Sequence, residues 1–262
     1  MFQRLFRYAF ISLLGLFVGL IGCLALDTTE PSRLAWRSVV YYGNAHECNI
    51  CGRTMARFEQ GSHTQNELQC PFCGSRPRHR TANIYFGEHT DIFSGERRKM
   101  LHVAPEPFFT EKFTKISNLD YLSGDLNPAA AMVQMDITDI QFPDNTFDII
   151  YCSHVLEHVP DDRKAMRELA RVLTPDGWGI LAVPVIRPRT VEDPTVKTDE
   201  DRFRVYGQAD HVRAYGPDFA DRLRESGFDV TIDSFASSFS PEQVERFGLS
   251  REQMYVVRKR KG

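Results

Sequence analysis

Short apolar, strand-like segments alternate with helical segments from about residue 81 onwards in this chain of 262 residues. The strand-like segments cover 100–103, 120–124, 147–152 and 178–183, and each ends in polar or turn residues. A further apolar stretch precedes Asp136, so these four segments are the first, second, fourth and fifth expected strands. Strands separated by helices build a parallel sheet that is covered by helices on both faces. The alternation therefore predicts an α/β domain with a doubly wound, mostly parallel sheet over residues 81–262.

The helical segments carry start and stop signals of their own. Residues 161–162 are two aspartates that can cap a helix, and apolar residues then recur at helical spacing until the turn residues 175–177. A further helix is expected over 217–226. The segments 228–232 and 254–257 are apolar enough to form a closing pair of strands.

Four cysteines stand in two closely spaced pairs, Cys48 with Cys51 and Cys70 with Cys73, and 18 residues separate the pairs. A glycine follows each pair and permits the tight turn that lets two thiolates converge on one ion. Four thiolates fill the coordination sphere of a tetrahedral zinc, so such an ion would be structural. Two disulfides in an exported module would use the same cysteines. The spacing predicts a small zinc ribbon with four cysteine ligands over residues 40–80.

An uncharged run of 19 residues, 8–26, follows two arginines near the start of the chain. As one helix it would nearly cross the hydrocarbon core of a membrane. We interpret residues 1–30 as a segment with one transmembrane helix that anchors the chain. A cleaved signal peptide, or a lipoprotein signal that ends at Cys23, is the alternative.

The overall charge gives no sign of a nucleic-acid partner. The formal net charge is −3, which provides no broad basic surface. Arg76, Arg78 and Arg80 form a short basic cluster that could meet a phosphate, a lipid headgroup or an acidic face of the next domain. We therefore expect nucleic acid to be an unlikely partner, and the oligomeric state has no signal in the sequence.

Three phrases in fixed order carry a family resemblance: FDII at 147–150, HVLEHV at 154–159 and RVLTPDG at 171–177. They resemble class I S-adenosylmethionine-dependent methyltransferases of the type-11 group over residues 98–184. Together with the paired cysteines, the chain is similar to bacterial-type methyltransferases with an N-terminal zinc ribbon. The resemblance implies a Rossmann-like methyltransferase fold in which S-adenosylmethionine lies across the carboxyl ends of the first strands.

The resemblance also implies residues that bind the cofactor. Asp125, at the end of the second strand, can accept hydrogen bonds from both ribose hydroxyls, or it can cap the turn that follows. Asp136 resembles the family position that meets the adenine amino group, with Ile137 packed on the ring; an ordinary loop carboxylate is the alternative. Ser153, after the fourth strand, is assigned to the same site.

The loop after the first strand departs from the family pattern, because it has no glycine where the family has a glycine-rich turn. Glycine lets the backbone approach the methionine part of the cofactor closely. Here Ala104 and Glu106 stand in the loop, each followed by a proline. We expect Ala104 and Glu106 to contact the cofactor, with Glu106 facing its ammonium group. A binding module that has lost its cofactor is the alternative.

Methyl transfer mainly requires alignment of the acceptor, with at most the removal of one proton. His154 follows the fourth strand, where the family places residues that face the substrate, and we predict that it orients or deprotonates the acceptor. His158 would permit a metal site with His154, but we interpret it as a packing or capping residue. In the long polar connection after the fifth strand, His211 and Tyr215 are predicted to hold the acceptor; a segment pinned by its own ion pairs is equally possible.

The sequence therefore predicts a membrane-anchored methyltransferase with an unidentified acceptor, favouring a small molecule, a glycan or a lipid. An RNA methyltransferase that holds RNA with its zinc ribbon and a non-enzymatic binding module are the alternatives. Zinc-binding thiols need a reducing compartment and S-adenosylmethionine is made in the cytosol, so we expect a single-pass membrane protein whose catalytic domain is cytoplasmic. The two arginines before the apolar run favour the opposite orientation.

Overall fold

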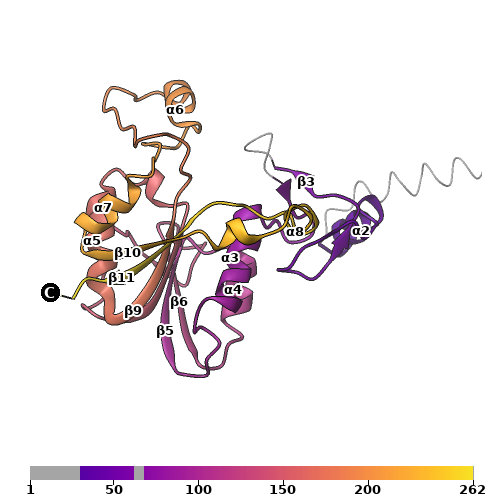
Figure 1. The fold of residues 1–262 in the computed structure, drawn as a ribbon, viewed down its shortest axis with the longest axis horizontal. Helices are drawn as coiled ribbons and strands as arrows, with labels where there is room; N and C mark the ends of the chain where they lie inside the picture. Colours follow the sequence, from indigo (N-terminus) through magenta and orange to yellow (C-terminus); the bar gives the residue numbers. More distant parts are fainter. Residues whose placement is uncertain (1–29, 62–67, 262) are drawn as a thin grey trace, which may run out of the picture. The chain divides into compact units, whose positions relative to one another are not determined.

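A computed structural model of the chain describes residues 30–61 and 68–261 (Figure 1). The predicted membrane anchor at 8–26 lies outside these residues. Among the helices of the two described ranges, none is long and apolar enough to cross a membrane. Contacts divide the chain into two compact units. Of the described residues, those up to Arg80 form one unit together with Ser240–Leu249, and Thr81–Phe239 form the other together with those from Ser250 onwards.

The larger unit is built on a seven-stranded sheet in the order β10-β11-β9-β8-β5-β6-β7. Its strands are β5 (Arg98–Val103), β6 (Leu119–Asp125), β7 (Val133–Gln134), β8 (Phe147–Ser153), β9 (Leu173–Ala182), β10 (Phe228–Asp233) and β11 (Met254–Lys259). Neighbouring strands are parallel except where β11 pairs with β9 and β10. The predicted doubly wound, mostly parallel sheet is therefore confirmed, as is the closing antiparallel strand pair.

The order of the strands places a crevice at a definite point. From β5 the chain runs outwards through β6 and β7 on one side, and it then returns to build β8 and β9 on the other side. In open α/β sheets, ligands bind outside the carboxyl ends of the strands where the order reverses in this way. The ends of β5 and β8 are this point in the present fold.

Helices and short helical turns complete the larger unit and connect its strands. They are the continuation of α3 (Pro77–Glu88), then α4 (Pro107–Phe113), η1 (Leu156–His158), α5 (Asp162–Val172), α6 (Asp199–Tyr206), α7 (Phe219–Glu225) and η2 (Phe235–Ser238). Figure 1 shows α5 and α7 on one face of the sheet and α4 on the other.

The central strands are buried on both faces, which explains their continuous apolar sequences. On one face Leu101 and Val103 of β5 and Ile150 of β8 join the core cluster that α5 and α7 complete. On the other face Tyr151 of β8 packs edge-on against Phe86, with ring centroids 5.1 Å apart. Burying one large apolar side chain contributes about 1.5–3 kcal/mol, so these two layers fix the positions of β5 and β8.

The α5 helix begins as predicted and ends earlier than predicted. Asp161 is its N-cap, and its carboxylate accepts a hydrogen bond from the backbone nitrogen of Lys164 at 2.9 Å. The helix stops at Val172, three residues before the Pro175 turn that we expected to end it. Leu173 already has an extended backbone and pairs with Phe147 of β8. Strand pairing therefore ends this helix before the proline does.

The described residues of the smaller unit form two short antiparallel strand pairs and the helices α2 and α8. The elements are α2 (Glu30–Val40), β1 (His46–Glu47), β2 (Thr54–Met55), β3 (Glu59–Gln60), β4 (Leu68–Gln69) and α8 (Pro241–Phe247), and α3 starts in this unit. The α8 helix contacts β1, where the Glu245 carbonyl lies 2.9 Å from Nδ1 of His46. We expected 240–249 to belong to the domain over 81–262, whereas these residues belong to the smaller unit.

Candidate functional site

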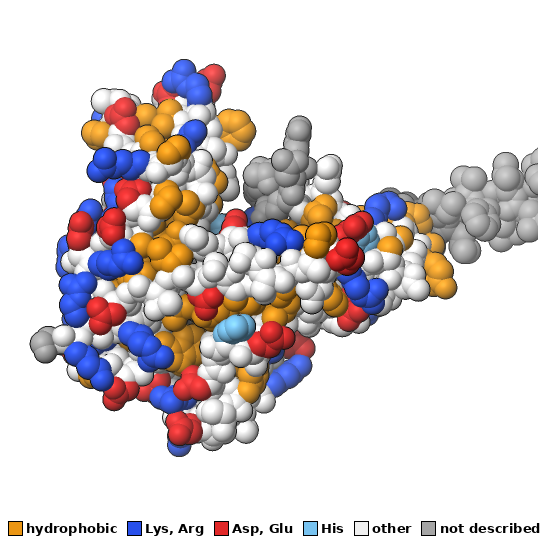
Figure 2. All heavy atoms as spheres, in the orientation of Figure 1, with side chains coloured by type: hydrophobic (Ala, Val, Ile, Leu, Met, Phe, Trp, Pro, Cys, Tyr) orange, Lys and Arg blue, Asp and Glu red, His pale blue; other side chains and the backbone are white. Residues whose placement is uncertain are grey.

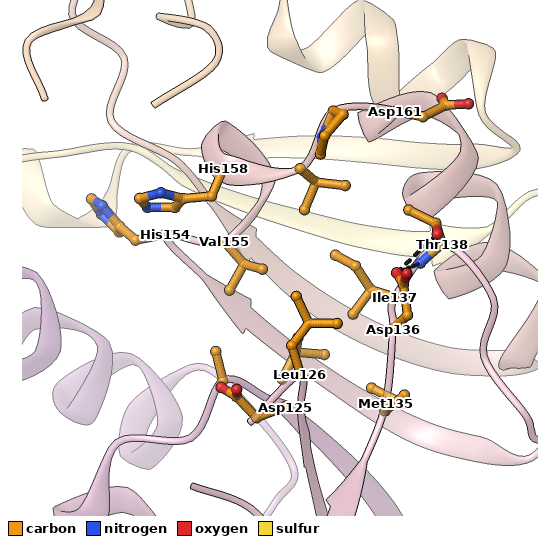
Figure 3. Close-up of a pocket in the computed structure, with 14 residues that line it drawn as sticks. Asp125, Leu126, Met135, Asp136, Ile137, Thr138, His154, Val155, His158 and Asp161 are labelled. Atoms are coloured by element: carbon orange, nitrogen blue, oxygen red, sulfur yellow. Dashed lines mark hydrogen bonds between the residues drawn. The ribbon is translucent and has the colours of Figure 1, made fainter. Parts of the chain in front are cut away.

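A cavity of about 410 Å³ opens at the carboxyl ends of β5, β6 and β8 (Figure 3). Its walls are mostly apolar, with a few carboxylates and imidazoles, which is the usual character of a small-molecule site. The lining residues are Val103, Ala104, Asp125, Leu126, Met135, Asp136, Ile137, Thr138, His154, Val155, His158, Val159, Pro160 and Asp161. The cavity thus lies where the strand order reverses.

Two aspartates at the cavity are held by one carboxylate oxygen each. Oδ1 of Asp125 accepts a hydrogen bond from the Asn127 backbone nitrogen at 2.7 Å. Oδ1 of Asp136 accepts two from Thr138, from its backbone nitrogen and its hydroxyl, both at 2.8 Å (Figure 3). The turn-capping role that we considered for Asp125 is therefore present. It orients the carboxylate and leaves the second oxygen available to a ligand.

Two apolar side chains lie near these aspartates at the cavity. Ile137 is almost fully buried, whereas Leu126 exposes 67% of its surface. Figure 3 shows Leu126 beside Ile137, with Asp125 and Asp136 nearby. An exposed leucine at a cavity can pack on a flat ring. Leu126 was not predicted from the sequence, although its position directly after Asp125 could have indicated a place at the cavity.

The first loop lacks glycine and still adopts a backbone that favours glycine. Ala104 has φ of 50°, and its backbone nitrogen donates to the Gly124 carbonyl at 2.8 Å. His154, at the end of β8, has φ of 56°. A non-glycine residue with such a φ is strained, and strained residues cluster at functional sites. Both residues line the cavity, as the sequence predicted for a cofactor loop and a substrate-facing histidine.

Glu106 and Ser153 are not among the residues that line the cavity. Oε2 of Glu106 lies 2.9 Å from Nε2 of His102, a fully buried histidine of β5. Ser153 is buried at the end of β8. The structure therefore brings together Ala104, Asp125, Asp136, Ile137 and His154 of the predicted residues and places these two outside the cavity wall.

Comparison with known proteins matches part of the chain to a family. Residues 109–181 match the family model described as "Methyltransferase domain", of the type-11 group. The chain carries a type-11 methyltransferase domain. The prediction of an S-adenosylmethionine-dependent methyltransferase is thereby confirmed at the level of the family.

Curated relatives of the methyltransferase domain match it over part of their length. The chain is 40% identical over 74 residues to the uncharacterized methyltransferase YcgJ of Bacillus subtilis, covering 28% of each chain. It is 25% identical over 148 residues to 27-O-demethylrifamycin SV methyltransferase of Amycolatopsis mediterranei, covering 55% of this chain and 53% of the relative. The chain thus spans about half or less of the length of these relatives.

Among solved structures, the crystal structure of YcgJ from Bacillus subtilis is similar to this chain. The similarity has a TM-score of 0.47 at 18% sequence identity, and it covers 71% of this chain and all of that one.

Three histidines of the larger unit lie close to the Glu157 carboxylate. Nδ1 of His154 lies 3.3 Å from Oε1 of Glu157, and the rings of His158 and His211 meet edge-on with centroids 4.7 Å apart. Glu157, His158 and His211 each place one ligand atom within 4.8 Å of the others. His211 is buried, and burial lowers its pKa below the ordinary value. The predicted residues His154 and His211 thus both lie near Glu157, and His211 does not line the cavity.

Tyr215 lies in the core of the larger unit and does not line the cavity. Its side chain is fully buried, and its hydroxyl donates to Oδ2 of Asp162 at 2.6 Å. Burial raises the pKa of Tyr215 well above the ordinary value, and the Asp162 carboxylate adds to this effect. Arg213 is also buried and pairs with Glu192 at 2.8 Å. The connection after β9 is therefore held by its own ion pairs, which is the second of the two interpretations that the sequence left open.

In the smaller unit the four paired cysteines converge. Their sulfur atoms all lie within 4.8 Å of one another, and none is in a disulfide. The Cys48–Cys73 and Cys51–Cys70 sulfur distances are 3.7 and 3.8 Å. A tetrahedral zinc with bonds of about 2.3 Å places its sulfurs about 3.8 Å apart. The donor set therefore fits a tetrahedral zinc.

The two cysteine pairs have the same backbone geometry. Gly52 donates to the Cys48 carbonyl at 2.8 Å, and Gly74 donates to the Cys70 carbonyl at 2.9 Å. Both glycines have positive φ, 70° and 75°. These are the turns that the sequence predicted from the glycine after each pair. Each turn presents two sulfurs on one side of the chain, as a ribbon-type metal centre requires.

Arg80 belongs to this centre and is not a surface residue of the basic cluster. Its guanidinium is fully buried, donates to the Phe247 and Gly248 carbonyls at 2.8 Å, and lies 4.2 Å from the Phe58 ring centroid. No carboxylate of the described residues pairs with it. It also donates to Ser75, whose hydroxyl lies 3.2–3.3 Å from two of the sulfurs. A zinc tetrathiolate would supply the missing negative charge.

A first prediction concerns the cluster of four cysteines. The purified full chain should contain one zinc, and Cys70→Ser should lose it, because three thiolates no longer close the sphere. Cys152→Ser, which changes a buried cysteine outside the cluster, is the matched control and should retain zinc. Elemental analysis measures both. A wild-type chain without zinc, or with the four thiols oxidised in pairs, would contradict the metal centre.

A second prediction concerns Asp125. Asp125→Ala should weaken S-adenosylmethionine binding by about 2 kcal/mol, because charge-assisted hydrogen bonds to the ribose are lost. Asp125→Asn should keep the turn and still weaken binding, and Asp120→Ala, an exposed position of the same strand, should bind as wild type. Titration calorimetry measures the three dissociation constants. Equal affinity of Asp125→Ala and wild type would remove Asp125 from the site.

A third prediction tests the buried tyrosine. Tyr215→Phe should lower the free energy of unfolding by about 1–2 kcal/mol, because the buried Asp162 carboxylate loses a hydrogen bond. Binding of S-adenosylmethionine should not change, since Tyr215 does not line the cavity. Denaturant unfolding and calorimetry provide the two values. Unchanged stability together with weaker cofactor binding would return Tyr215 to the site.

Proposed function

We propose that this chain transfers a methyl group from S-adenosylmethionine to an acceptor bound beside His154. The observation that carries the proposal is the cavity where the strand order reverses. Asp125, Asp136, Ile137 and His154 all line this cavity. The chain also matches a type-11 methyltransferase domain over residues 109–181.

The residues at the cavity fit the parts of the cofactor. The available oxygen of Asp125 can accept hydrogen bonds from ribose hydroxyls, and that of Asp136 can accept one from the adenine amino group. Ile137 and Leu126 can pack on the faces of the base. When bound, S-adenosylmethionine supplies a methyl group on a sulfonium that a nucleophile can displace in line.

The protein contributes alignment and, where the acceptor needs it, removal of one proton. His154 is the residue placed for this, because it lines the cavity and its ring nitrogen Nδ1 is 3.3 Å from the Glu157 carboxylate. A carboxylate beside an imidazole orients the ring. His154 can therefore orient the acceptor and accept its proton as the methyl group moves.

The charge distribution favours an acceptor other than RNA. In Figure 2 acidic and basic side chains are interspersed over the face shown. On α6, for example, three acidic residues in the first turn are followed by Arg202 and Arg204. Phosphate backbones require a surface of positive charge. The Amycolatopsis relative is named for a small-molecule acceptor, which supports an acceptor of that class here.

We further propose a structural zinc in the cysteine centre and membrane attachment through residues 8–26, with the catalytic domain in the cytoplasm. The sulfur geometry supports the zinc. The uncharged 19-residue run supports the attachment, and the need for reduced thiols and for a cytosolic cofactor supports the orientation.

The experiment that tests the function uses the full chain in detergent micelles. The protein is incubated with S-adenosylmethionine carrying a deuterated methyl group and with small-molecule and lipid extracts of the source cells. Mass spectrometry should find a product with the labelled methyl group, and Asp125→Ala should form much less of it. A wild-type chain that does not bind S-adenosylmethionine by calorimetry would contradict the proposal and leave a non-enzymatic binding module.

A further inference from the structure

A buried carboxylate beside the cavity has no lysine or arginine partner among the described residues. Glu157 is 1% exposed, and neither of its carboxylate oxygens accepts a hydrogen bond from the residues that the structure describes. Its one short polar contact is Oε1 to Nδ1 of His154 at 3.3 Å. No lysine or arginine in the described ranges forms an ion pair with it. A buried charge requires a partner or a metal ion, because removing it from water is otherwise too unfavourable.

Two histidines surround this carboxylate. Glu157, His158 and His211 each place one ligand atom within 4.8 Å of the others. His211 is 3% exposed, and its Nδ1 has no hydrogen-bond partner in the described part of the chain. The carboxylate of Asp210 lies 3.3 Å from Nδ1 of His158 and adds negative charge to the cluster.

The backbone holds these groups together although they come from distant parts of the sequence. The Val212 backbone nitrogen donates to the Glu157 carbonyl at 2.9 Å. The buried Arg213 guanidinium donates to the Leu156 carbonyl at 2.7 Å. Two residues of η1 and the two residues after His211 are thus fixed to each other. The cluster is held in place by the fold and does not depend on a chance side-chain conformation.

The size of the cluster suits a metal ion. Ligand atoms at about 2.1 Å from one ion lie about 3.0–4.2 Å apart, depending on the angle between them. The present ligand atoms all lie within 4.8 Å of one another, so small side-chain rotations bring them onto one ion. Two imidazoles with one carboxylate form a set that binds first-row transition ions and leaves coordination positions open. His154 and His158 line the cavity, as Figure 3 shows, so open positions would face it.

We propose that Glu157, His158 and His211 bind a divalent transition-metal ion, and that the ion holds a hydroxyl group of the acceptor. The role toward the acceptor rests on the proposed methyl transfer; the metal site does not. A metal ion lowers the pKa of a bound hydroxyl group. The hydroxyl proton moves to His154, the oxygen lone pair forms the bond to the methyl carbon, and the carbon–sulfur bond breaks with its electron pair moving to sulfur. The products are a methyl ether and S-adenosylhomocysteine.

The test uses the zinc-loaded full chain and Co²⁺ as the probe, without S-adenosylmethionine. Wild type should bind one Co²⁺ in addition to its zinc, with visible absorption bands and unchanged zinc content by elemental analysis. Glu157→Gln and His211→Ala should weaken this binding by about 100-fold, because each removes a ligand. His89→Ala, an exposed histidine of the same unit, should bind as wild type. Circular dichroism confirms that each variant is folded.

Azide probes the open positions and should change the cobalt spectrum of wild type. A wild-type chain that binds no additional Co²⁺, or a Glu157→Gln chain that binds it equally well, would overturn the metal site and leave a His154–Glu157 ion pair. A spectrum that azide does not change would overturn the role toward the acceptor. Calorimetry with S-adenosylmethionine on the metal-free chain tests the proposed function separately, so the two failures are distinguishable.

Discussion

The pairing of β5 with β8 in the middle of the sheet is the constraint on which the rest of the larger unit depends. Both strands are buried on both faces, by the α5 and α7 core on one side and by aromatic rings on the other. Their registers join Val103 to Cys152, so the two strands end at the same level. The residues that follow, Ala104 and His154, are thereby brought to one cavity. The apolar core thus determines where the polar site lies.

Strain and local hydrogen bonds refine that site. Ala104 and His154 both have positive φ at the point where their strands end, and the surrounding core holds them there. Asp125 and Asp136 each use one oxygen to fix a turn. A carboxylate fixed in this way needs no reorganisation when a ligand arrives. The cavity is accordingly pre-organised by contacts that the chain makes within its own loops.

The sequence was sufficient for the sheet, for the cysteine centre and for Asp125, Asp136 and His154 of the cavity wall, because each depends on local patterns. Alternating apolar segments indicate parallel strands, and an acidic residue at a strand end is a local signal. The burial of Arg80 and Tyr215 was not predictable in this way, since their partners are distant in sequence. The same holds for 240–249, which joins the smaller unit through contacts with β1. His211 lies more than 50 positions after Glu157, and the fold alone places the two side chains together.

The central claim is that the cofactor binds where the strand order reverses, and hydrogen exchange measured by mass spectrometry tests it most directly. Added S-adenosylhomocysteine should slow amide exchange in peptides that contain Ala104, 125–127, 136–138 and 153–155, and should leave α6 unchanged. A second cavity of the same unit, lined by Tyr85, His89 and Trp178, provides the contrast. Slower exchange around that cavity, or no change at the carboxyl ends of β5, β6 and β8, would contradict the account.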